Sequence, residues 1–260
     1  MAQQGTDYDV ALAEAQRLGY AEPDPTADVE GFDAASKASI IASLAFGARV
    51  VAGDVYREGI SAVTAADITA ARELGYVIKL LAIAEERDGA VAVRVHPTMV
   101  PAAHPLASVR GSFNAVFVEG EAVGDLMLYG RGAGGGPTAI AVLGDLVDAA
   151  TNLRNGARGA TLGELVRKPI RPIDEVESQF YLTVDVADRP GVLAAIAGVF
   201  GRHGVSIQSM HQQGQGSEAR IIFVTHLAPE AALAATVHEV RELDTVERVG
   251  SILRVIGGAA

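Results

Sequence analysis

The last third of the chain alternates between strand-like and helix-like stretches in an order that fits few small folds. Alternating apolar residues predict strands, and apolar residues three or four apart predict helices. The predicted order is strand 179–191, helix 192–204, strand 205–213, strand 219–228, helix 229–243 and strand 246–255. This β-α-β-β-α-β order is that of a ferredoxin-like unit. We therefore expect a separate C-terminal domain at 178–257.

The preceding part of the chain predicts a second domain. Its helices and strands come in separate runs rather than in alternation, which is typical of the α+β class. Adjacent short strands favour a mainly antiparallel sheet with helices on one side. The expected helices are 7–19, 34–47, 64–75 and 137–153, and the expected strands are 76–86, 90–100, 114–120 and 125–130. We expect this domain at 1–155, and a linker with basic residues and prolines at 156–177.

Charge and composition argue against several classes of function. The 260 residues carry a formal net charge of −11, so binding of nucleic acid or of an anionic membrane is not expected. No apolar run reaches the roughly 20 residues that span a bilayer. The chain has no cysteine, which excludes disulfides, thiolate metal sites and a cysteine nucleophile. These features predict a soluble, cytoplasmic protein.

One acidic segment, 19–37, places several carboxylates close to a single lysine. Two prolines and many acidic residues predict a loop over 20–33. Asp33 is expected to cap the following helix, and Lys37 lies four residues further on, on the same helix face. Carboxylates could hold a substrate's amino group while the lysine exchanges a proton.

Two other interpretations of the acidic segment stay open at this point. It fits an ordinary solvated loop with an exposed ion pair, since such pairs are common and weak. It also fits an oxygen-rich site for Mg²⁺ or Ca²⁺. The spacing does not match an EF-hand, and we expect no metal.

A glycine-rich turn has the spacing G-x-G-x-x-G at Gly130, Gly132 and Gly135. Such a turn binds a dinucleotide when it follows the first strand of a βαβ unit. Here it follows several other strands, and the helix after it leads into a loop instead of a second parallel strand. The turn is therefore not expected to form a nucleotide-binding domain of its own.

Two long stretches resemble known families. The segment 19–37, G-Y-A-E-P-D-P-T-A-D-V-E-G-F-D-A-A-S-K, and its continuation over 95–139 resemble homoserine dehydrogenase. The segment 185–210, which begins D-V-A-D-R-P-G-V-L, resembles an ACT domain, a small module that binds amino acids, and this likeness extends over 180–255. The combination is similar to the bacterial single-function dehydrogenase. That family interconverts L-homoserine and L-aspartate 4-semialdehyde with NAD or NADP, in the biosynthesis of threonine, methionine and isoleucine.

The resemblance implies roles for four residues of the acidic segment. Lys37 would exchange a proton with the substrate oxygen, Glu22 and Asp33 would bind the polar groups of homoserine, and Asp28 would support them. Oxidation of an alcohol by hydride loss needs a base at the hydroxyl, and the reverse reaction needs an acid there. Neighbouring carboxylates favour a charged lysine, whereas burial favours a neutral one.

The resemblance also implies contacts to a cofactor and to an effector. Gly19 and Gly134 would lie against NADP or NAD; the sequence is compatible with either. Asp188 and Gly191 would bind an amino-acid effector, threonine in this family, where helix amides attract a carboxylate. ACT domains usually pair their sheets, so a homo-oligomer is expected.

The family's nucleotide-binding domain, which precedes the substrate segment, has no counterpart in this sequence. The resemblance therefore predicts a part of the enzyme that does not transfer hydride alone. A non-enzymatic amino-acid sensor and an inert remnant are the other two interpretations. The helix over 137–150 has apolar residues around much of its circumference. We expect the missing domain or a second copy of the chain to cover it.

Overall fold

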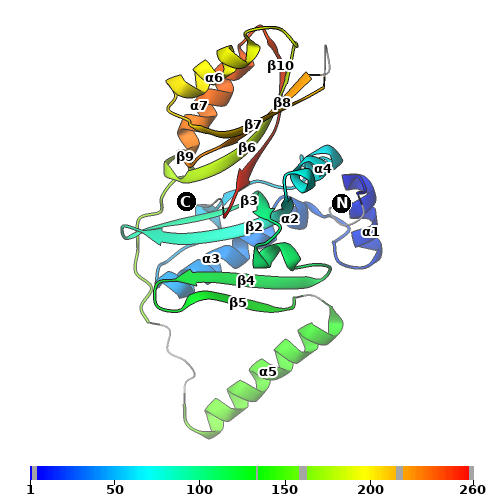
Figure 1. Cartoon of the computed structure of the whole chain (residues 1–260). Helices are drawn as coiled ribbons and strands as arrows, with labels where there is room; N and C mark the ends of the chain where they lie inside the picture. The colour runs from blue at the N-terminus through cyan, green and yellow to red at the C-terminus, as the bar shows by residue number, and fades with distance from the viewer. Residues whose placement is uncertain (2–4, 133, 158–162, 215–218, 258–260) are drawn as a thin grey trace.

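The computed structural model describes residues 1, 5–132, 134–157, 163–214 and 219–257. These residues form two parts that share one sheet (Figure 1). The α-helices are α1 (Tyr8–Arg17), α2 (Thr26–Val29), α3 (Phe32–Phe46), α4 (Ala65–Glu73), α5 (Gly135–Arg154), α6 (Val192–Arg202) and α7 (Glu230–Arg241). The strands are β1 (Tyr56–Arg57), β2 (Tyr76–Arg87), β3 (Ala90–Pro101), β4 (Phe113–Gly120), β5 (Gly124–Arg131), β6 (Glu177–Val186), β7 (Ile207–Gln213), β8 (Ala219–Thr225), β9 (Ala228–Pro229) and β10 (Val246–Val255). The predicted α+β class, with mainly antiparallel pairing, is confirmed.

In the N-terminal part, α3 packs on β2 and β3. The helix turns Ala35, Ala38 and Ala42 toward the sheet, and Val93 and Val95 of β3 meet them in a buried cluster. Small alanine side chains let the helix axis approach the sheet closely. This packing fixes the helix that carries Asp33 and Lys37, although both of these side chains lie on its exposed face.

Strands β4 and β5 form a separate two-stranded sheet. The sequence favoured one antiparallel sheet for the four strands of this part, and the structure divides them. Neither β4 nor β5 can pair with β3, because both of its edges are occupied, and among the described residues neither pairs with the outer edge of β2. Strand β2 pairs along one edge, and β1 and β10 pair in parallel along the other.

The C-terminal part has the predicted β-α-β-β-α-β order, with strand order β10-β6-β8-β7. Helices α6 and α7 cover one face of this sheet, and Phe180, Phe200 and Phe223 lie in the core between them. The other face packs on α4, where Tyr181 and Ile222 meet the apolar side of that helix. The ferredoxin-like prediction is therefore confirmed.

Strand β10 joins the two parts, as the red strand of Figure 1 shows. Strand β10 pairs antiparallel with β6 along most of its length, and its last two residues also pair in parallel with β3. In that parallel pairing Arg254 lies opposite Thr98, and Val255 lies opposite Met99. The sheet of eight strands is thus continuous across both parts, and the domain limits 1–155, 156–177 and 178–257 stay a prediction.

Two local expectations differ from the structure. Asp33 was expected to cap the helix, and this is wrong: α3 starts at Phe32, its N-cap is Gly31 with φ +77°, and Asp33 lies in the first turn. The segment 20–33 was expected to be a loop, but it contains the one-turn helix α2. Residues 158–162 of the expected linker and residue 133 of the glycine turn lie outside the described residues.

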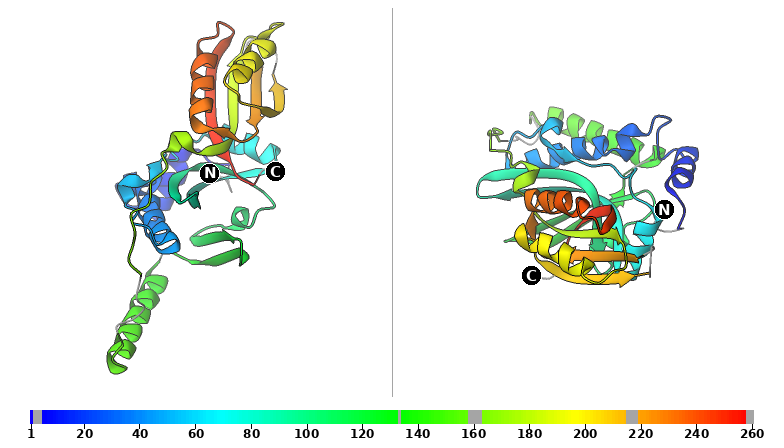
Figure 2. Two further views of the ribbon diagram at one scale, coloured as in Figure 1. Left: turned by 90° about the vertical axis from the view of Figure 1, so that its left-hand side faces the viewer. Right: turned by 90° about the horizontal axis from the view of Figure 1, so that it is seen from above.

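Helix α5 extends away from the rest of the molecule (Figures 1 and 2). None of its residues is buried, and its exposed large apolar residues are Ile140, Val142, Leu143, Leu146, Val147 and Leu153. No helix of the described part is both long and apolar enough to pass through a bilayer.

Candidate functional site

Hydrogen bonds between residues close in sequence hold the acidic segment in shape. The carboxylate of Asp24 accepts from the backbone and the hydroxyl of Thr26, at 3.1 and 2.7 Å. The carboxylate of Asp28 accepts from the backbone N–H of Glu22 at 3.3 Å. This contact brings together two of the four predicted site residues and leaves the Glu22 side chain exposed.

The other two predicted residues form an ion pair on α3. The Lys37 ammonium lies 2.6 Å from the Asp33 carboxylate, which confirms that the two residues share a helix face. The side chains are 66% and 50% exposed. Among the described residues, no ion pair links Lys37 to Glu22 or Asp28. The structure therefore shows two neighbouring pairs on an open surface rather than one closed cleft. Solvent covers most of the lysine, so the described residues do not dehydrate it.

The turn that starts α3 is supported by a segment that sequence reasoning missed. Ser61 donates to the Glu30 carboxylate at 2.8 Å, and the N–H of Ile60 donates to the carbonyl of Val29 at 2.8 Å. The Arg57 guanidinium lies 3.7 Å from the ring centroid of Phe32, the first residue of α3. Residues 57–61 thus fix the point at which the helix carrying Asp33 and Lys37 begins.

Gly59 is the tightest point of this support, and its substitution is expected to displace the start of α3. A Cβ at Gly59 would lie 2.7 Å from the carbonyl oxygen of Val29 and 2.8 Å from the Cα of Glu30, both backbone atoms. Overpacking of this kind costs about 1–3 kcal/mol. We expect Gly59→Ala to lower the unfolding free energy by that amount, as measured by urea denaturation. Gly53→Ala is the control, because a Cβ there meets nothing within 4 Å; equal losses in both variants would contradict the prediction.

The two predicted cofactor glycines lie on exposed turns. Gly19 follows the last residues of α1 with φ +75°, and Gly134 precedes α5 with φ +113°. A Cβ at Gly134 would approach only Pro137, at 3.7 Å, and a Cβ at Gly19 would meet nothing within 4 Å. The glycine turn joins an antiparallel hairpin to α5, with no βαβ unit around it among the described residues. Open space at both glycines leaves room for a ligand to approach the main chain.

The predicted effector turn has the backbone expected for it. Gly191 is the N-cap of α6 with φ +94°, and Asp188 precedes it on an exposed turn. A Cβ at Gly191 would meet nothing within 4 Å. The helix therefore begins after Pro190, as the sequence predicts.

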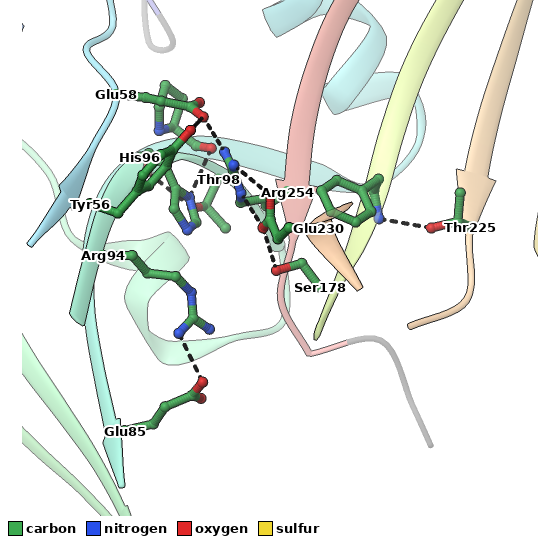
Figure 3. A network of polar contacts seen from close by, with 12 residues as sticks. Tyr56, Glu58, Glu85, Arg94, His96, Thr98, Ser178, Thr225, Glu230 and Arg254 are labelled. Carbon is green, nitrogen blue, oxygen red and sulfur yellow. Dashed lines mark hydrogen bonds and ion pairs between the residues drawn. The ribbon is translucent and has the colours of Figure 1, made fainter. Parts of the chain in front are cut away.

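A buried charge network joins the two parts where β10 meets β3 (Figure 3). The Arg254 guanidinium donates to both carboxylate oxygens of Glu230 on α7, at 2.6 and 2.7 Å. Its remaining nitrogen lies 2.9 Å from the Glu58 carboxylate of the N-terminal part. The Ser178 hydroxyl also donates to the Glu230 carboxylate, at 2.8 Å. Although burial opposes its charge, these carboxylates hold the pKa of Arg254 above its usual value.

Two further groups line this network. His96 is fully buried on β3, where Thr98 contacts its Nδ1 at 2.8 Å. Burial, with the charges of Arg254 and Arg94 beside it, holds the pKa of His96 well below its usual range. Burial and the hydrogen bond to Glu58 raise the pKa of Tyr56 to about 12. His96 is therefore neutral inside the junction at physiological pH. No local sequence signal identified any of these residues.

The described residues contain no group of three or more histidine, cysteine, aspartate or glutamate side chains placed to hold a metal ion.

Comparison with known proteins gives two family matches. Residues 1–147 match the family model of homoserine dehydrogenase, and residues 180–245 match that of the ACT domain. The homoserine dehydrogenase of Mycobacterium tuberculosis is 52% identical over 264 residues, and the match covers 97% of this chain and 60% of that protein. That of Corynebacterium glutamicum is 52% identical over 256 residues, covering 96% of this chain and 58% of that protein.

A solved structure supports the same assignment. The homoserine dehydrogenase of Thiobacillus denitrificans superposes with a TM-score of 0.91 at 40% identity, over 98% of this chain and 60% of that one. This chain thus spans about 60% of the length of the relatives that it matches. The matched region includes the segment with Lys37 and the turn at Gly134. The chain belongs to the homoserine dehydrogenase family and carries an ACT domain.

Proposed function

We propose that this chain supplies the substrate-binding and regulatory parts of a homoserine dehydrogenase, an oxidoreductase of amino-acid biosynthesis in the cytoplasm. The reaction would interconvert L-homoserine and L-aspartate 4-semialdehyde with NADP or NAD. The observation that carries this proposal is the Lys37–Asp33 pair, which lies open to a ligand within the family-specific region and next to Glu22 and Asp28 in sequence.

The side chains fit the polar groups of homoserine. The carboxylates of Glu22 and Asp33 would bind the ammonium and hydroxyl groups, and Asp28 would keep Glu22 in place through its backbone. The Lys37 ammonium would contact the substrate oxygen and exchange its proton there. Because the lysine is exposed in this chain, further protein has to cover the site before water is excluded.

The cofactor fit is partial. Gly19 and Gly134 leave their main chain open to a flat ring, but the glycine turn lacks the βαβ setting that binds a pyrophosphate. When bound, NAD or NADP supplies the hydride acceptor. The residues of this chain would contact only one end of it, and the remainder would rest on a nucleotide-binding domain. Tested without such a domain, the 260 residues are expected to bind substrate without oxidising it.

In the regulatory part of the proposal, the ACT domain binds an amino-acid effector, threonine, at Asp188 and Gly191. The chain would also form a homo-oligomer. Strand β7 is the outer strand of the sheet, and most of its residues are exposed. An exposed edge strand of this kind pairs readily with a second chain. Nucleic acid and membranes are not among the proposed partners, in keeping with the net charge of −11.

Calorimetric titration of the chain with L-homoserine tests the proposal. We expect saturable binding that weakens at least about tenfold, or about 1.4 kcal/mol, in Glu22→Gln and in Asp33→Asn. Glu14→Gln on α1 is the control, because Glu14 pairs only with Arg17 of its own helix among the described residues. Threonine binding without homoserine binding would favour the sensor instead, and binding of neither would favour an inert remnant.

A further inference from the structure

A cavity of about 400 Å³ lies between the two parts of the chain. One wall is the segment from Glu58 to Asp67, which leads into α4 and forms its first turn. The other wall is the face of the C-terminal sheet turned away from α6 and α7, with Thr183 and Ser251 in it. The volume lies in the range of small-molecule sites, about 300–1,000 Å³. The cavity is separate from Lys37 and from the turn at Gly191, neither of which lines it.

The sheet wall of the cavity carries excess positive charge. Arg220 and Arg248 lie on β8 and β10, on either side of Asp185 of β6. Both guanidinium groups bind that one carboxylate, Arg220 at 2.6 Å and Arg248 at 2.9 Å. Two positive charges therefore share one negative charge. Arg220 uses only its Nε for Asp185, so its two terminal nitrogens have no hydrogen bond within the described residues.

The opposite wall carries a buried carboxylate. One oxygen of Asp67 accepts from the N–H and the hydroxyl of Thr64, at 2.9 and 2.7 Å, which caps α4. The other oxygen accepts no hydrogen bond from the described residues. The charge of Asp67 also acts on Arg220 on the far wall: the pKa of Arg220 is raised mainly by its hydrogen bond to Asp185, and Asp67 adds a smaller effect. A ligand between these walls would meet two arginines that share the Asp185 carboxylate on one side, and the Asp67 carboxylate on the other.

A buried hydroxyl near Asp67 and Arg220 also lacks a hydrogen-bond partner among the described residues. Tyr181 is almost fully buried between α4 and the sheet, and its hydroxyl makes no hydrogen bond within the described residues. Burial, together with the charge of Asp67, raises the pKa of Tyr181 to about 12. A buried unsatisfied hydroxyl costs about 1–3 kcal/mol. The charges of Asp67 and Arg220 act on this hydroxyl, although Tyr181 itself does not line the cavity.

Gly250 keeps the sheet wall open. A Cβ at this position would overlap the hydroxyl of Thr183, which already accepts from the N–H of Ser251 at 3.1 Å. The absence of a side chain at Gly250 leaves space in front of β10, between the arginine pair and the first turn of α4.

We propose that this cavity binds a small zwitterionic amino acid, with its carboxylate on Arg220 and Arg248 and its ammonium on Asp67. Charge-assisted, bidentate hydrogen bonds to a guanidinium are among the strong hydrogen bonds that a carboxylate makes in proteins. Such a ligand bridges the N-terminal part to the C-terminal sheet, so its binding energy depends on how the two parts are placed. The site would connect the ACT domain to the N-terminal part of the chain without using the turn at Gly191. It goes beyond the proposed dehydrogenase function and does not rest on it.

The test uses calorimetric titration of the chain with L-threonine as the probe. We expect two classes of threonine site. Arg248→Gln and Asp67→Asn weaken the cavity site at least tenfold, whereas Asp188→Asn leaves the cavity site unchanged and weakens only the effector site at the α6 turn. The amide introduced by Asp67→Asn still offers an oxygen to cap α4, and Arg248 is exposed, so both variants are expected to fold; circular dichroism checks this. Arg202→Gln is the matched control, since Arg202 pairs with Glu239 on the helix face of the same domain.

Two analogues test the zwitterion itself. 3-Hydroxybutyrate lacks the ammonium of threonine, and 1-amino-2-propanol lacks the carboxylate, and each is expected to bind at least tenfold more weakly. The proposal would be overturned if Asp188→Asn abolished all threonine binding and no site were weakened by Arg248→Gln, if 3-hydroxybutyrate bound equally well, or if threonine did not bind. Homoserine binding that depends on Glu22 and Asp33 is measured separately, so either proposal can fail while the other stands.

Discussion

Replacing Arg254 with methionine is expected to lower the free energy of unfolding by about 3–5 kcal/mol. Arg254 and Glu230 are each only 9% exposed, and the guanidinium makes both hydrogen bonds to that carboxylate. Methionine keeps most of the volume but leaves Glu230 as a buried negative charge, with Ser178 as its remaining hydrogen-bond donor among the described side chains. The cost of removing one partner is therefore the desolvation of the other, rather than the modest net value of the pair.

The matched control for Arg254 is Arg248, a second arginine on β10. Arg248→Met also removes a contact to a carboxylate, but the Arg248 side chain is 68% exposed and Asp185 keeps Arg220. Exposed pairs contribute about 0–1 kcal/mol, so the loss should be small. Urea denaturation followed by circular dichroism measures both variants. Similar losses for the two arginines would show that the junction network is not what holds the two parts together.

A double variant separates charge burial from packing. If the uncompensated Glu230 causes the loss, then Glu230→Gln in the Arg254→Met background should recover part of the lost stability, because a neutral amide is less costly to bury than a carboxylate. A double variant no more stable than Arg254→Met would point instead to lost packing against Tyr56, whose ring centroid lies 5.4 Å from the guanidinium.

The junction was beyond what the sequence could predict. The order of strands and helices in the C-terminal part follows from local periodicity, so the ferredoxin-like unit was predicted correctly. The parallel pairing of β10 with β3 joins residues such as Arg254 and Thr98 that lie far apart in sequence. Apolar alternation sets the face of a strand but not its neighbour. Likewise, nothing local distinguishes Arg254 from an exposed arginine until Glu230 and Glu58 are brought beside it.

The sequence predicted the contact between Asp33 and Lys37, but not the helix cap or the exposure of the lysine. The spacing of Asp33 and Lys37 is a helix property, so their contact could be predicted, and the structure confirms it. The cap at Gly31 could not, because it depends on tertiary contacts: a Cβ there would lie 3.1 Å from Val95 of β3. The exposure of Lys37 was also outside the reach of the sequence, since burial depends on what packs over the helix.

Replacing Lys37 with methionine is expected to reduce homoserine oxidation by about 10²- to 10⁴-fold, the usual contribution of a positioned acid or base. Stability should change by no more than about 1 kcal/mol, because the Lys37–Asp33 pair is exposed. A residue that is dispensable for folding but required for turnover is what the proposed function demands of this position. If Lys37 and Asp33 formed only a solvated ion pair on the helix, Lys37→Met would reduce neither turnover nor stability.

The measurement uses a chimera in which the residues of the Mycobacterium tuberculosis relative that this chain does not span are joined to it. Turnover is followed with L-homoserine and NADP or NAD, and unfolding is followed in urea. Arg17→Met is the matched control: Arg17 forms a helix pair with Glu14, and their exposures of 67% and 48% are close to the 66% and 50% of Lys37 and Asp33. Both variants should be equally stable, and only Lys37→Met should lose turnover. If Lys37→Met kept normal turnover while binding homoserine, proton exchange would have to be assigned to another group. The Glu22, Asp33 and Lys37 surface would then be a binding site without the catalytic lysine.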